Sequence, residues 1–439
     1  MKKLINFLMA AACVLSTAHA GSKHSAASKF PSYEGRVMAG YQGWFRAPED
    51  GSGGGWGHYG VHGKFDMNHL HVDLWPDVSE YTKTYETALK NTDGSPARVF
   101  SSWDESTVDI HFKWMKDYGI DGAFMQRFIG VTRNPEQRAK SRVILDHALK
   151  AAQANERAIA VMYDLSGLSA TGDDCSSVIE DWKELVDQMK LTSRGDDQTY
   201  LYHRGKPLVA IWGLGFPDRS YNIRTIGIER LIDFLKNDRE YGGCSVMLGV
   251  PTYFRELNID CLPDPYLHQI IAKADIVLPW TPQRFSPLLH NERERFGALV
   301  KGDIAWCTER KVDYVPCVYP GFSWYNLSKL EFGGAHPLDQ IPRQKGKFYW
   351  DLISTAIDSQ AKMLYVAMFD EMDEATAIFK CTSDLPMGAA LTDYEGMPSD
   401  HYLWLTGQGG KMLRKEIPFT KEIPARVKEV VGEPVERTK

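Results

Sequence analysis

Four carboxylates close together, Asp370, Glu371, Asp373 and Glu374, are the strongest chemical signal in the sequence. They follow an apolar, strand-like run that begins at Leu364. Burying several ionised groups without partners would cost many kcal/mol, so this cluster should lie where a strand opens onto a pocket. Glu371 and Glu374 can then share that pocket, one as a proton donor and the other as a base or nucleophile. Such acids also favour helix N-termini, and a helix start is the structural alternative.

Apolar runs and helical periodicities alternate along the chain, which indicates how these acids are positioned. The predicted strands are 36–45, 119–128, 158–165, 207–213, 244–251, 275–280, 312–319 and the run starting at Leu364. The predicted helices are 106–117, 136–155, 176–191, 226–237, 265–272, 292–308, a segment within 339–362, and 401–413. Continuous apolar strands separated by helices are typical of a parallel sheet covered on both faces. Eight in series predict an α/β fold, a (β/α)8 TIM barrel, with a long first βα loop over residues 46–105.

The active site of such a barrel lies at the C-terminal ends of its strands, so its residues can be predicted in turn. They combine aromatic rings, amides, one cation and carboxylates, which suit a carbohydrate better than a phosphate or a flat cofactor. The predicted substrate-binding residues are Tyr41, Trp44, Gln126, Arg127, Asp164, Tyr253, Trp280, Tyr319 and Asp370, beside the catalytic pair Glu371 and Glu374. Gln42, Tyr163, Trp212, Thr252 and Trp324 occupy similar positions. Glycoside hydrolysis fits this set, because it needs two carboxyl groups flanking an anomeric carbon. Two structural alternatives stay open: Arg127 can be a partner for Asp164, and Tyr163 can be a core residue.

The predicted first loop is rich in histidine: His58, His62, His69 and His71, with Asp73 close by. A zinc site needs three or four converging ligands, and irregular spacing within a glycine-rich loop is weak evidence for one. We therefore predict no metal and no cofactor, and expect one or two of these groups to bind sugar hydroxyls. Capping of the loop is the expected role of Asp73. A metal-dependent hydrolase remains an alternative that rests on this loop alone.

The N-terminal residues indicate export. Residues 1–20 have two lysines, an apolar core and an Ala18-His19-Ala20 ending, as a secretory signal peptide does, and Cys13 leaves a lipoprotein anchor open. Residues 21–35 are predicted to be a flexible leader, 36–415 the catalytic barrel and 416–439 a C-terminal tail. The expected location is periplasmic or extracellular. No later stretch predicts a membrane span.

Composition limits the partners. The chain has 439 residues and a net charge of −6, which gives no reason to expect nucleic acid. It has 12 Trp, 20 Tyr and 19 Phe, and those placed just past strand ends favour stacking on sugar rings over simple core packing. The cysteines after Cys13 are Cys175, Cys244, Cys261, Cys307, Cys317 and Cys381, and none has a metal-binding spacing. Cys244 and Cys317 lie within predicted strands, where they can be free and buried.

Four segments resemble glycoside hydrolase families 99 and 71, and in particular the exported Bacteroides-type proteins labelled xylosidase/arabinosidase. They are 40–45 (GYQGWF), 73–79 (DLWPDVS), 119–127 (GIDGAFMQR) and 369–376 (FDEMDEAT). The last resembles the family 99 pattern Asn-Glu-Trp-His-Glu-Gly-Thr, whose two glutamates carry catalysis. The resemblance implies that Glu371 assists attack by the sugar's own 2-hydroxyl, through a 1,2-anhydro intermediate, and that Glu374 is the general acid.

The pattern also departs from that family. Asp370, Met372, Asp373 and Ala375 stand where it has Asn, Trp, His and Gly. We therefore expect an exported, retaining glycoside hydrolase that acts on an α-linked polysaccharide or glycan, either α-mannoside-like or α-glucan-like. The alternative is a non-catalytic carbohydrate-binding protein on a glycosidase barrel.

Overall fold

The structure is a computed structural model that describes residues 22–169, 174–195, 198–331, 333–334 and 336–426. Its main sheet is parallel and follows the order β10-β9-β8-β7-β5-β4-β1-β12-β11, with β6 added to β7 in antiparallel orientation. The strands are β1 (Val37–Tyr41), β4 (Gly122–Phe128), β5 (Ala158–Asp164), β6 (Tyr202–His203), β7 (Lys206–Trp212), β8 (Ser245–Pro251), β9 (Ile276–Trp280), β10 (Asp313–Tyr314), β11 (Cys317–Val318) and β12 (Leu364–Val366). In β7 and β8 every residue except Lys206 is buried, as the continuous apolar runs predict.

The sheet closes through one interrupted strand. β10 pairs with β9 and β11 pairs with β12, and only Val315 and Pro316 separate β10 from β11. Proline has no N–H to donate, but its carbonyl accepts a hydrogen bond from the Tyr365 N–H at 3.1 Å, while the Val315 N–H donates to the carbonyl of Val277 at 3.0 Å. The predicted strand 312–319 therefore bridges both neighbours, and the predicted (β/α)8 barrel is confirmed.

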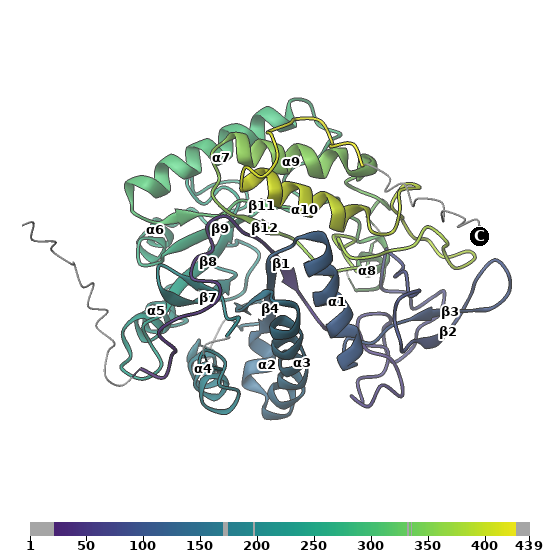
Figure 1. Cartoon of the computed structure of the whole chain (residues 1–439), viewed down its shortest axis with the longest axis horizontal. Helices are drawn as coiled ribbons and strands as arrows, with labels where there is room; N and C mark the ends of the chain where they lie inside the picture. The colour runs from purple at the N-terminus through teal and green to yellow at the C-terminus, as the bar shows by residue number, and fades with distance from the viewer. Residues whose placement is uncertain (1–21, 170–173, 196–197, 332, 335, 427–439) are drawn as a thin grey trace, which may run out of the picture.

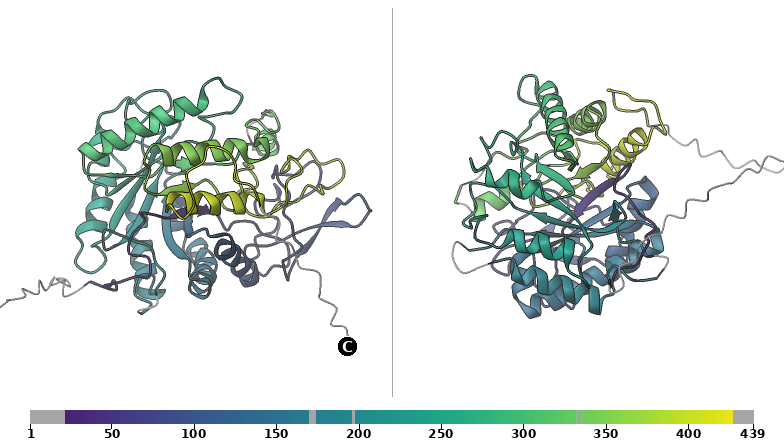
Figure 2. Two further views of the ribbon diagram at one scale, coloured as in Figure 1. Left: turned by 45° about the horizontal axis from the view of Figure 1, so that its top comes forward. Right: turned by 90° about the vertical axis from the view of Figure 1, so that its left-hand side faces the viewer.

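Helices surround the barrel (Figures 1 and 2). They are α1 (Glu105–Tyr118), α2 (Ile129–Arg133), α3 (Pro135–Asn155), α4 (Ser176–Gln188), α5 (Ile228–Asn237), α6 (Tyr266–Ile271), α7 (Glu292–Glu309), α8 (Tyr325–Glu331), the 3-10 turn η1 (Gln344–Gly346), α9 (Lys347–Asp358) and α10 (His401–Leu413). In Figure 1, α7, α9 and α10 lie along the top of the view and α2, α3 and α4 along the bottom, with the strands between them. None of the helices in the described ranges is both long and apolar enough to cross a membrane.

Within the first βα loop the sequence predicts one short extended piece, residues 97–102, and no second strand. The structure has a hairpin here: β3 (Pro96–Val99) falls near that piece, but its antiparallel partner β2 (Tyr85–Lys90) was not predicted. β2 buries only Thr87 and Leu89, so its pattern lacks the long apolar run of a barrel strand. The hairpin projects from the side of the barrel (Figure 1).

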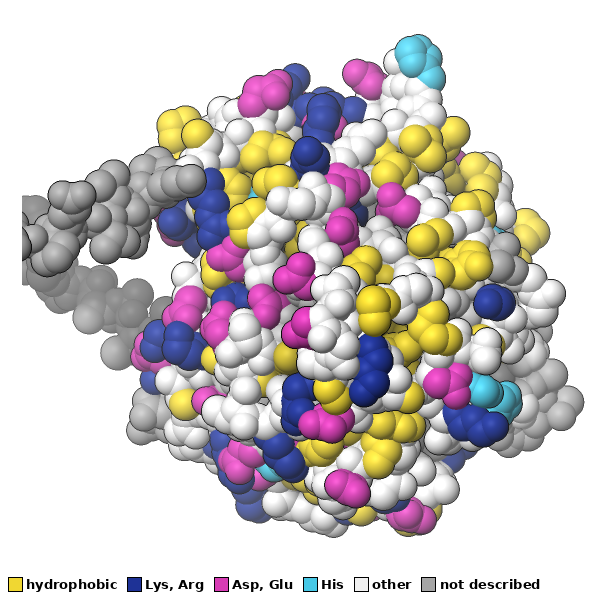
Figure 3. All heavy atoms as spheres, turned by 90° about the vertical axis from the view of Figure 1, so that its right-hand side faces the viewer, with side chains coloured by type: hydrophobic (Ala, Val, Ile, Leu, Met, Phe, Trp, Pro, Cys, Tyr) yellow, Lys and Arg dark blue, Asp and Glu magenta, His cyan; other side chains and the backbone are white. Residues whose placement is uncertain are grey.

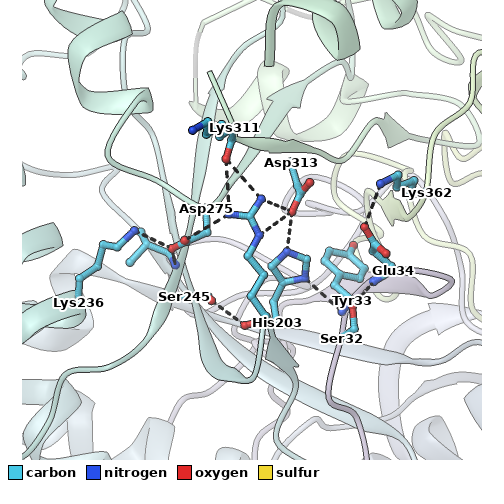
Figure 4. A network of polar contacts seen from close by, with 12 residues as sticks. Ser32, Tyr33, Glu34, His203, Lys236, Ser245, Asp275, Lys311, Asp313 and Lys362 are labelled. Atoms are coloured by element: carbon cyan, nitrogen blue, oxygen red, sulfur yellow. Dashed lines mark hydrogen bonds and ion pairs between the residues drawn. The ribbon is translucent and has the colours of Figure 1, made fainter. Parts of the chain in front are cut away.

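Residues 22–35, predicted to be a flexible leader, make defined contacts with the barrel. The Tyr33 hydroxyl is buried and donates to the carbonyl of Leu364 at 2.9 Å. The Tyr33 N–H reaches Nδ1 of His203 at 3.4 Å, and Nε2 of His203 lies 2.9 Å from Asp313 (Figure 4). Leu364 and Asp313 are the first residues of β12 and β10, so the leader packs opposite the edge where an active site is expected.

The described cysteines, Cys175 to Cys381, are all free and buried. The face seen in Figure 3 mixes acidic, basic and hydrophobic side chains. Of the predicted C-terminal tail, the structure describes residues up to 426, where the Arg426 guanidinium donates two hydrogen bonds to Asp400. The predicted signal peptide at 1–20 lies outside the described residues.

Candidate active site

The acidic residues sit on a compact loop at the C-terminal end of β12. The Met368 N–H donates to the carbonyl of Thr376 at 3.2 Å, and the Thr376 N–H donates to the carbonyl of Glu371 at 3.0 Å. The Ile378 N–H returns to the carbonyl of Phe369 at 3.1 Å. The loop folds back on itself and starts no helix, which removes the helix-cap alternative.

Asp370 points away from any substrate. It is fully buried, and its two carboxylate oxygens accept hydrogen bonds of 2.8 Å from the N–H groups of Gln42 and Gly43. This corrects its predicted place among the substrate-binding residues. Because its carboxylate fixes the backbone that follows β1, Asp370 positions Gln42.

Gln42 in turn holds one of the two glutamates. Its Nε2 donates to Oε2 of Glu371 at 2.8 Å, and Glu371 is 6% exposed. Glu374 is partly buried, and its backbone carbonyl accepts from the Ser323 N–H at 3.0 Å. The two carboxyl groups therefore have different environments, one hydrogen-bonded to an amide and one nearer to solvent.

Both glutamates line a single cavity of about 420 Å³. Of the other residues predicted from the sequence, this cavity brings together Gln42, Trp44, Gln126, Asp164, Trp212, Trp280 and Trp324. They come from the C-terminal ends of six different strands or the loops just after them, as expected of a barrel active site. An aromatic-walled cavity with a few convergent polar groups has the general make-up of a small-molecule site.

Several polar groups in this lining have no hydrogen-bond partner within the described ranges. They are the indole Nε1 of Trp44, the indole Nε1 of Trp212 and Oε1 of Gln42, all buried. A buried polar group without a partner costs free energy, so a ligand that supplies acceptors and donors would be stabilised here. Sugar hydroxyls can act as either.

The lack of a side chain at Gly249 leaves room for the Trp212 ring. A Cβ on Gly249 of the neighbouring strand would lie 2.2 Å from Cδ1 of Trp212. The Trp212 ring then packs against Phe216 at a centroid distance of 4.9 Å and edge-on against Trp280 at 5.3 Å. The three rings form one aromatic wall of the cavity.

Burial raises the pKa of four acids in or beside the cavity. Desolvation, with the charge of Asp373 second, raises the pKa of Glu374 to about 8. Desolvation and then the charge of Glu374 raise the pKa of Glu371 well above its usual range, against the hydrogen bond from Gln42. Desolvation raises the pKa of Asp370 to about 7 and that of Asp164 to about 6. The pair Glu371 and Glu374 favours sharing one proton over carrying two charges.

Four other predicted substrate-binding residues lie outside this cavity. Tyr41 is buried, with its hydroxyl 2.9 Å from Nδ1 of His111, and Tyr319 is buried, with its hydroxyl donating to the carbonyl of Phe285. Tyr253 accepts a hydrogen bond from Arg295. Arg127 is 3% exposed, and its Nε donates to Asp181 at 2.8 Å. Arg127 is thus a structural partner, as one open interpretation held, but of Asp181 rather than of Asp164.

Part of the lining was not predicted from the sequence: Phe128, Met162, Ser166, Phe216, Asp218, Arg219, Pro282, Gln283, Arg284 and Met368. Phe128 and Met162 lie within strands, and the others follow a strand by two residues or more. A wider window after each strand would have found this second group, at the cost of many false positives.

A second cavity of about 390 Å³ adjoins the first, and both are lined by Gln42, Trp44, Gln126 and Phe128. Its other walls include Arg46, Trp103 and Arg127, together with residues of α3. The space next to the glutamates is therefore elongated, as a chain of several sugar units would require.

His58 and His71 of the first loop meet at Asp373 beside these cavities. Nδ1 of His58 lies 3.1 Å from Oδ2 of Asp373, and Nδ1 of His71 lies 3.9 Å from the same oxygen. Asp73, predicted to cap its own loop, instead binds the start of a distant helix: its carboxylate accepts hydrogen bonds from the N–H groups of Tyr325 and Asn326 at the start of α8, at 2.6 and 2.9 Å.

Known structures share this architecture. The GH99 endo-α-mannosidase from Bacteroides thetaiotaomicron has a TM-score of 0.60 over 88% of this chain and 99% of its own, at 16% sequence identity. The chain has the fold of a family 99 glycoside hydrolase. A complex of that enzyme with Bis-Tris-propane has a TM-score of 0.58 with the same identity and coverage. A glycoside hydrolase-like protein has a TM-score of 0.50 at 13% identity, over 79% of this chain and 95% of its own. No protein-family model and no curated protein sequence matches the chain.

Proposed function

We propose that this protein is an exported glycoside hydrolase that cleaves an α-linked polysaccharide or glycan, α-mannoside-like or α-glucan-like. The observation that carries the proposal is the presence of Glu371 and Glu374 in one aromatic-walled cavity at the C-terminal edge of the barrel. Glycoside hydrolysis needs two carboxyl groups beside the same sugar, and aromatic faces suit its C–H surfaces.

The roles of the two glutamates are those that the resemblance to the family 99 pattern implies. Glu374, which is nearer to solvent, is the general acid that protonates the departing glycosidic oxygen. Glu371, held by the Gln42 amide, is the base that takes the proton from the sugar's own 2-hydroxyl as that oxygen attacks the anomeric carbon. The bond to the leaving sugar breaks as the 1,2-anhydro ring forms. Water then opens the ring, with the two glutamates in reversed roles, and the configuration is retained.

The decisive experiment compares Glu374→Gln with the surface control Glu309→Gln, which replaces a side chain 76% exposed on α7. Both variants and the wild type are screened on α-mannan, α-glucan and aryl α-glycosides. We expect Glu374→Gln to lose at least a thousandfold in kcat, because transfer of the proton to the leaving group is removed, while its circular dichroism and oligosaccharide affinity stay unchanged. The control should keep wild-type turnover. Full turnover by Glu374→Gln would refute the assignment.

The stereochemical outcome tests the mechanism separately. Proton NMR of the first product should show the α-anomer before mutarotation, as retention requires. A β-anomer would rule out the 1,2-anhydro route while leaving the glutamate pair in place.

A non-catalytic carbohydrate-binding protein is the second candidate. The observation in its favour is that Asp370 and Asp373, which replace the Asn and His of the family 99 pattern, are both tied to neighbouring groups of the protein. Binding of an oligosaccharide by the wild type, with no product from any substrate in the screen, would favour this candidate.

A further inference from the structure

We propose that His58, His71 and Asp373 form a binding site for one divalent transition-metal ion of the zinc class, which ties the first βα loop to the loop of catalytic acids. One ligand atom from each residue can be chosen so that all lie within 4.8 Å of one another. The proposal does not depend on the glycosidase function.

Local backbone pairing brings the two histidines together despite their irregular spacing in the sequence. Gly60 and Leu70 form an antiparallel bridge, and the His71 N–H donates to the carbonyl of Tyr59 at 3.0 Å. The ring of His58 is also held in place because it stacks on the Trp44 ring, at a centroid distance of 3.8 Å and an interplanar angle of 4°. Both rings therefore have restricted positions before any ion binds.

The hydrogen bond on the far side of His71 fixes which of its nitrogens faces Asp373. Nε2 of His71 lies 3.0 Å from Oε1 of Glu331. A carboxylate only accepts, so Nε2 carries a proton, and in the neutral ring Nδ1 is then a bare acceptor. A carboxylate that orients a histidine in this way is the usual outer neighbour of a metal-bound imidazole.

Two buried acceptors in this cluster have no partner. Nδ1 of His71 and Oδ1 of Asp373 make no hydrogen bond within the described ranges, although the two residues are 5% and 2% exposed. A cation bound between the two residues would compensate the free-energy cost of burying these groups. Two imidazole nitrogens and one carboxylate oxygen are the ligands that Zn²⁺ and similar ions prefer.

The separations fit such an ion. Tetrahedral bonds of about 2.0–2.1 Å place neighbouring ligand atoms about 3.3–3.4 Å apart. The observed 3.1 Å and 3.9 Å to Asp373 bracket that value. His58 lines the adjoining second cavity, but Asp373 and His71 line neither cavity, so we assign the ion to holding the loop rather than to acting on substrate. This role differs from that of a metal-dependent hydrolase.

The test is titration of tag-free, EDTA-treated protein with ZnCl₂ by calorimetry, and with CoCl₂ by visible absorption. We expect one equivalent to bind with a dissociation constant of about 10 μM or tighter, a tetrahedral cobalt spectrum, and a rise in melting temperature. Mg²⁺ and Ca²⁺ should compete poorly, because they prefer oxygen ligands.

Three variants locate the binding. Asp373→Asn should weaken zinc binding at least a hundredfold, and Glu331→Gln, whose side chain is 49% exposed and safe for folding, about 10–100-fold. His62→Ala removes an exposed histidine of the same loop and should leave the affinity unchanged. Absence of saturable zinc binding in the wild type, or wild-type affinity in both Asp373→Asn and Glu331→Gln, would overturn the proposal.

Discussion

Replacing Arg127 with methionine tests whether this residue binds substrate or holds the barrel together. The guanidinium of Arg127 is buried against Asp181, which is fully buried and also accepts a hydrogen bond from the Tyr163 hydroxyl at 2.8 Å. Nη1 of Arg127 donates to Ser141 at 2.6 Å. Without the guanidinium, the buried carboxylate of Asp181 would keep, among the described residues, only the side-chain hydrogen bond from Tyr163.

The expected loss follows from that isolation. Removing one partner of a buried ion pair costs about 3–5 kcal/mol, because the other charge stays buried without compensation. Arg127→Met should therefore lower the midpoint of urea unfolding by about 1 M or more. The double variant Arg127→Met/Asp181→Leu buries no charge, and it should recover most of the lost stability.

The assay pairs urea unfolding, followed by circular dichroism, with oligosaccharide binding at a temperature where the variant is folded. We expect the single variant to be unstable yet to bind within about threefold of the wild type. A variant that unfolds at the wild-type midpoint but no longer binds would refute this reasoning. It would return Arg127 to the substrate-binding residues predicted from the sequence.

Three further predictions address the cavity and the core. Gly249→Ala should cost about 1–3 kcal/mol in thermal unfolding and weaken oligosaccharide binding, because its Cβ would stand 2.2 Å from the Trp212 ring; unchanged binding would contradict the role of that ring. Trp212→Ala should weaken the same binding about tenfold in calorimetry, with circular dichroism unchanged. Burial raises the pKa of Asp303 to about 7 in spite of its ion pair with Arg255, so the folded state binds the extra proton between about pH 4 and pH 7. The free energy of unfolding should therefore fall as pH rises through that window, by up to about 1.4 kcal/mol per pH unit. Asp303→Asn should reduce this dependence on pH. An equal dependence in the variant and the wild type would contradict the prediction.

The barrel could be predicted because each of its strands is buried on both faces. Strands such as Ala158–Asp164 and Ser245–Pro251 read as unbroken apolar runs, and the structure places them within a residue or two of the predicted bounds. The β2–β3 hairpin was predicted only in part for the opposite reason. Its strands lie outside the barrel, where alternating polar residues give a signal too short to separate from a loop.

The candidate site could be predicted only where the position of a residue along its strand sets the direction of its side chain. Trp280, at the end of β9, faces the cavity as predicted. Tyr319 stands at the same relative place after β11, yet its ring turns into the core, where its hydroxyl finds the carbonyl of Phe285. Nothing in the sequence marks that partner, since it comes from a loop 34 residues away. Aromatic residues at strand ends therefore give candidates, and tertiary hydrogen bonds decide among them.

The limit of prediction from sequence is clearest in the acidic loop, because neighbouring carboxylates there face different parts of the molecule. Asp370 holds the backbone after β1, Glu371 faces the cavity, and Asp373 turns to His58 of the first loop. The Asp73 N–H donates to the carbonyl of Met372 at 2.9 Å, so the same loop is tied to the acids from a second side. The long insertion after β1 therefore contacts the acidic loop at both Asp373 and Met372, and these contacts help to fix the direction in which each carboxylate points.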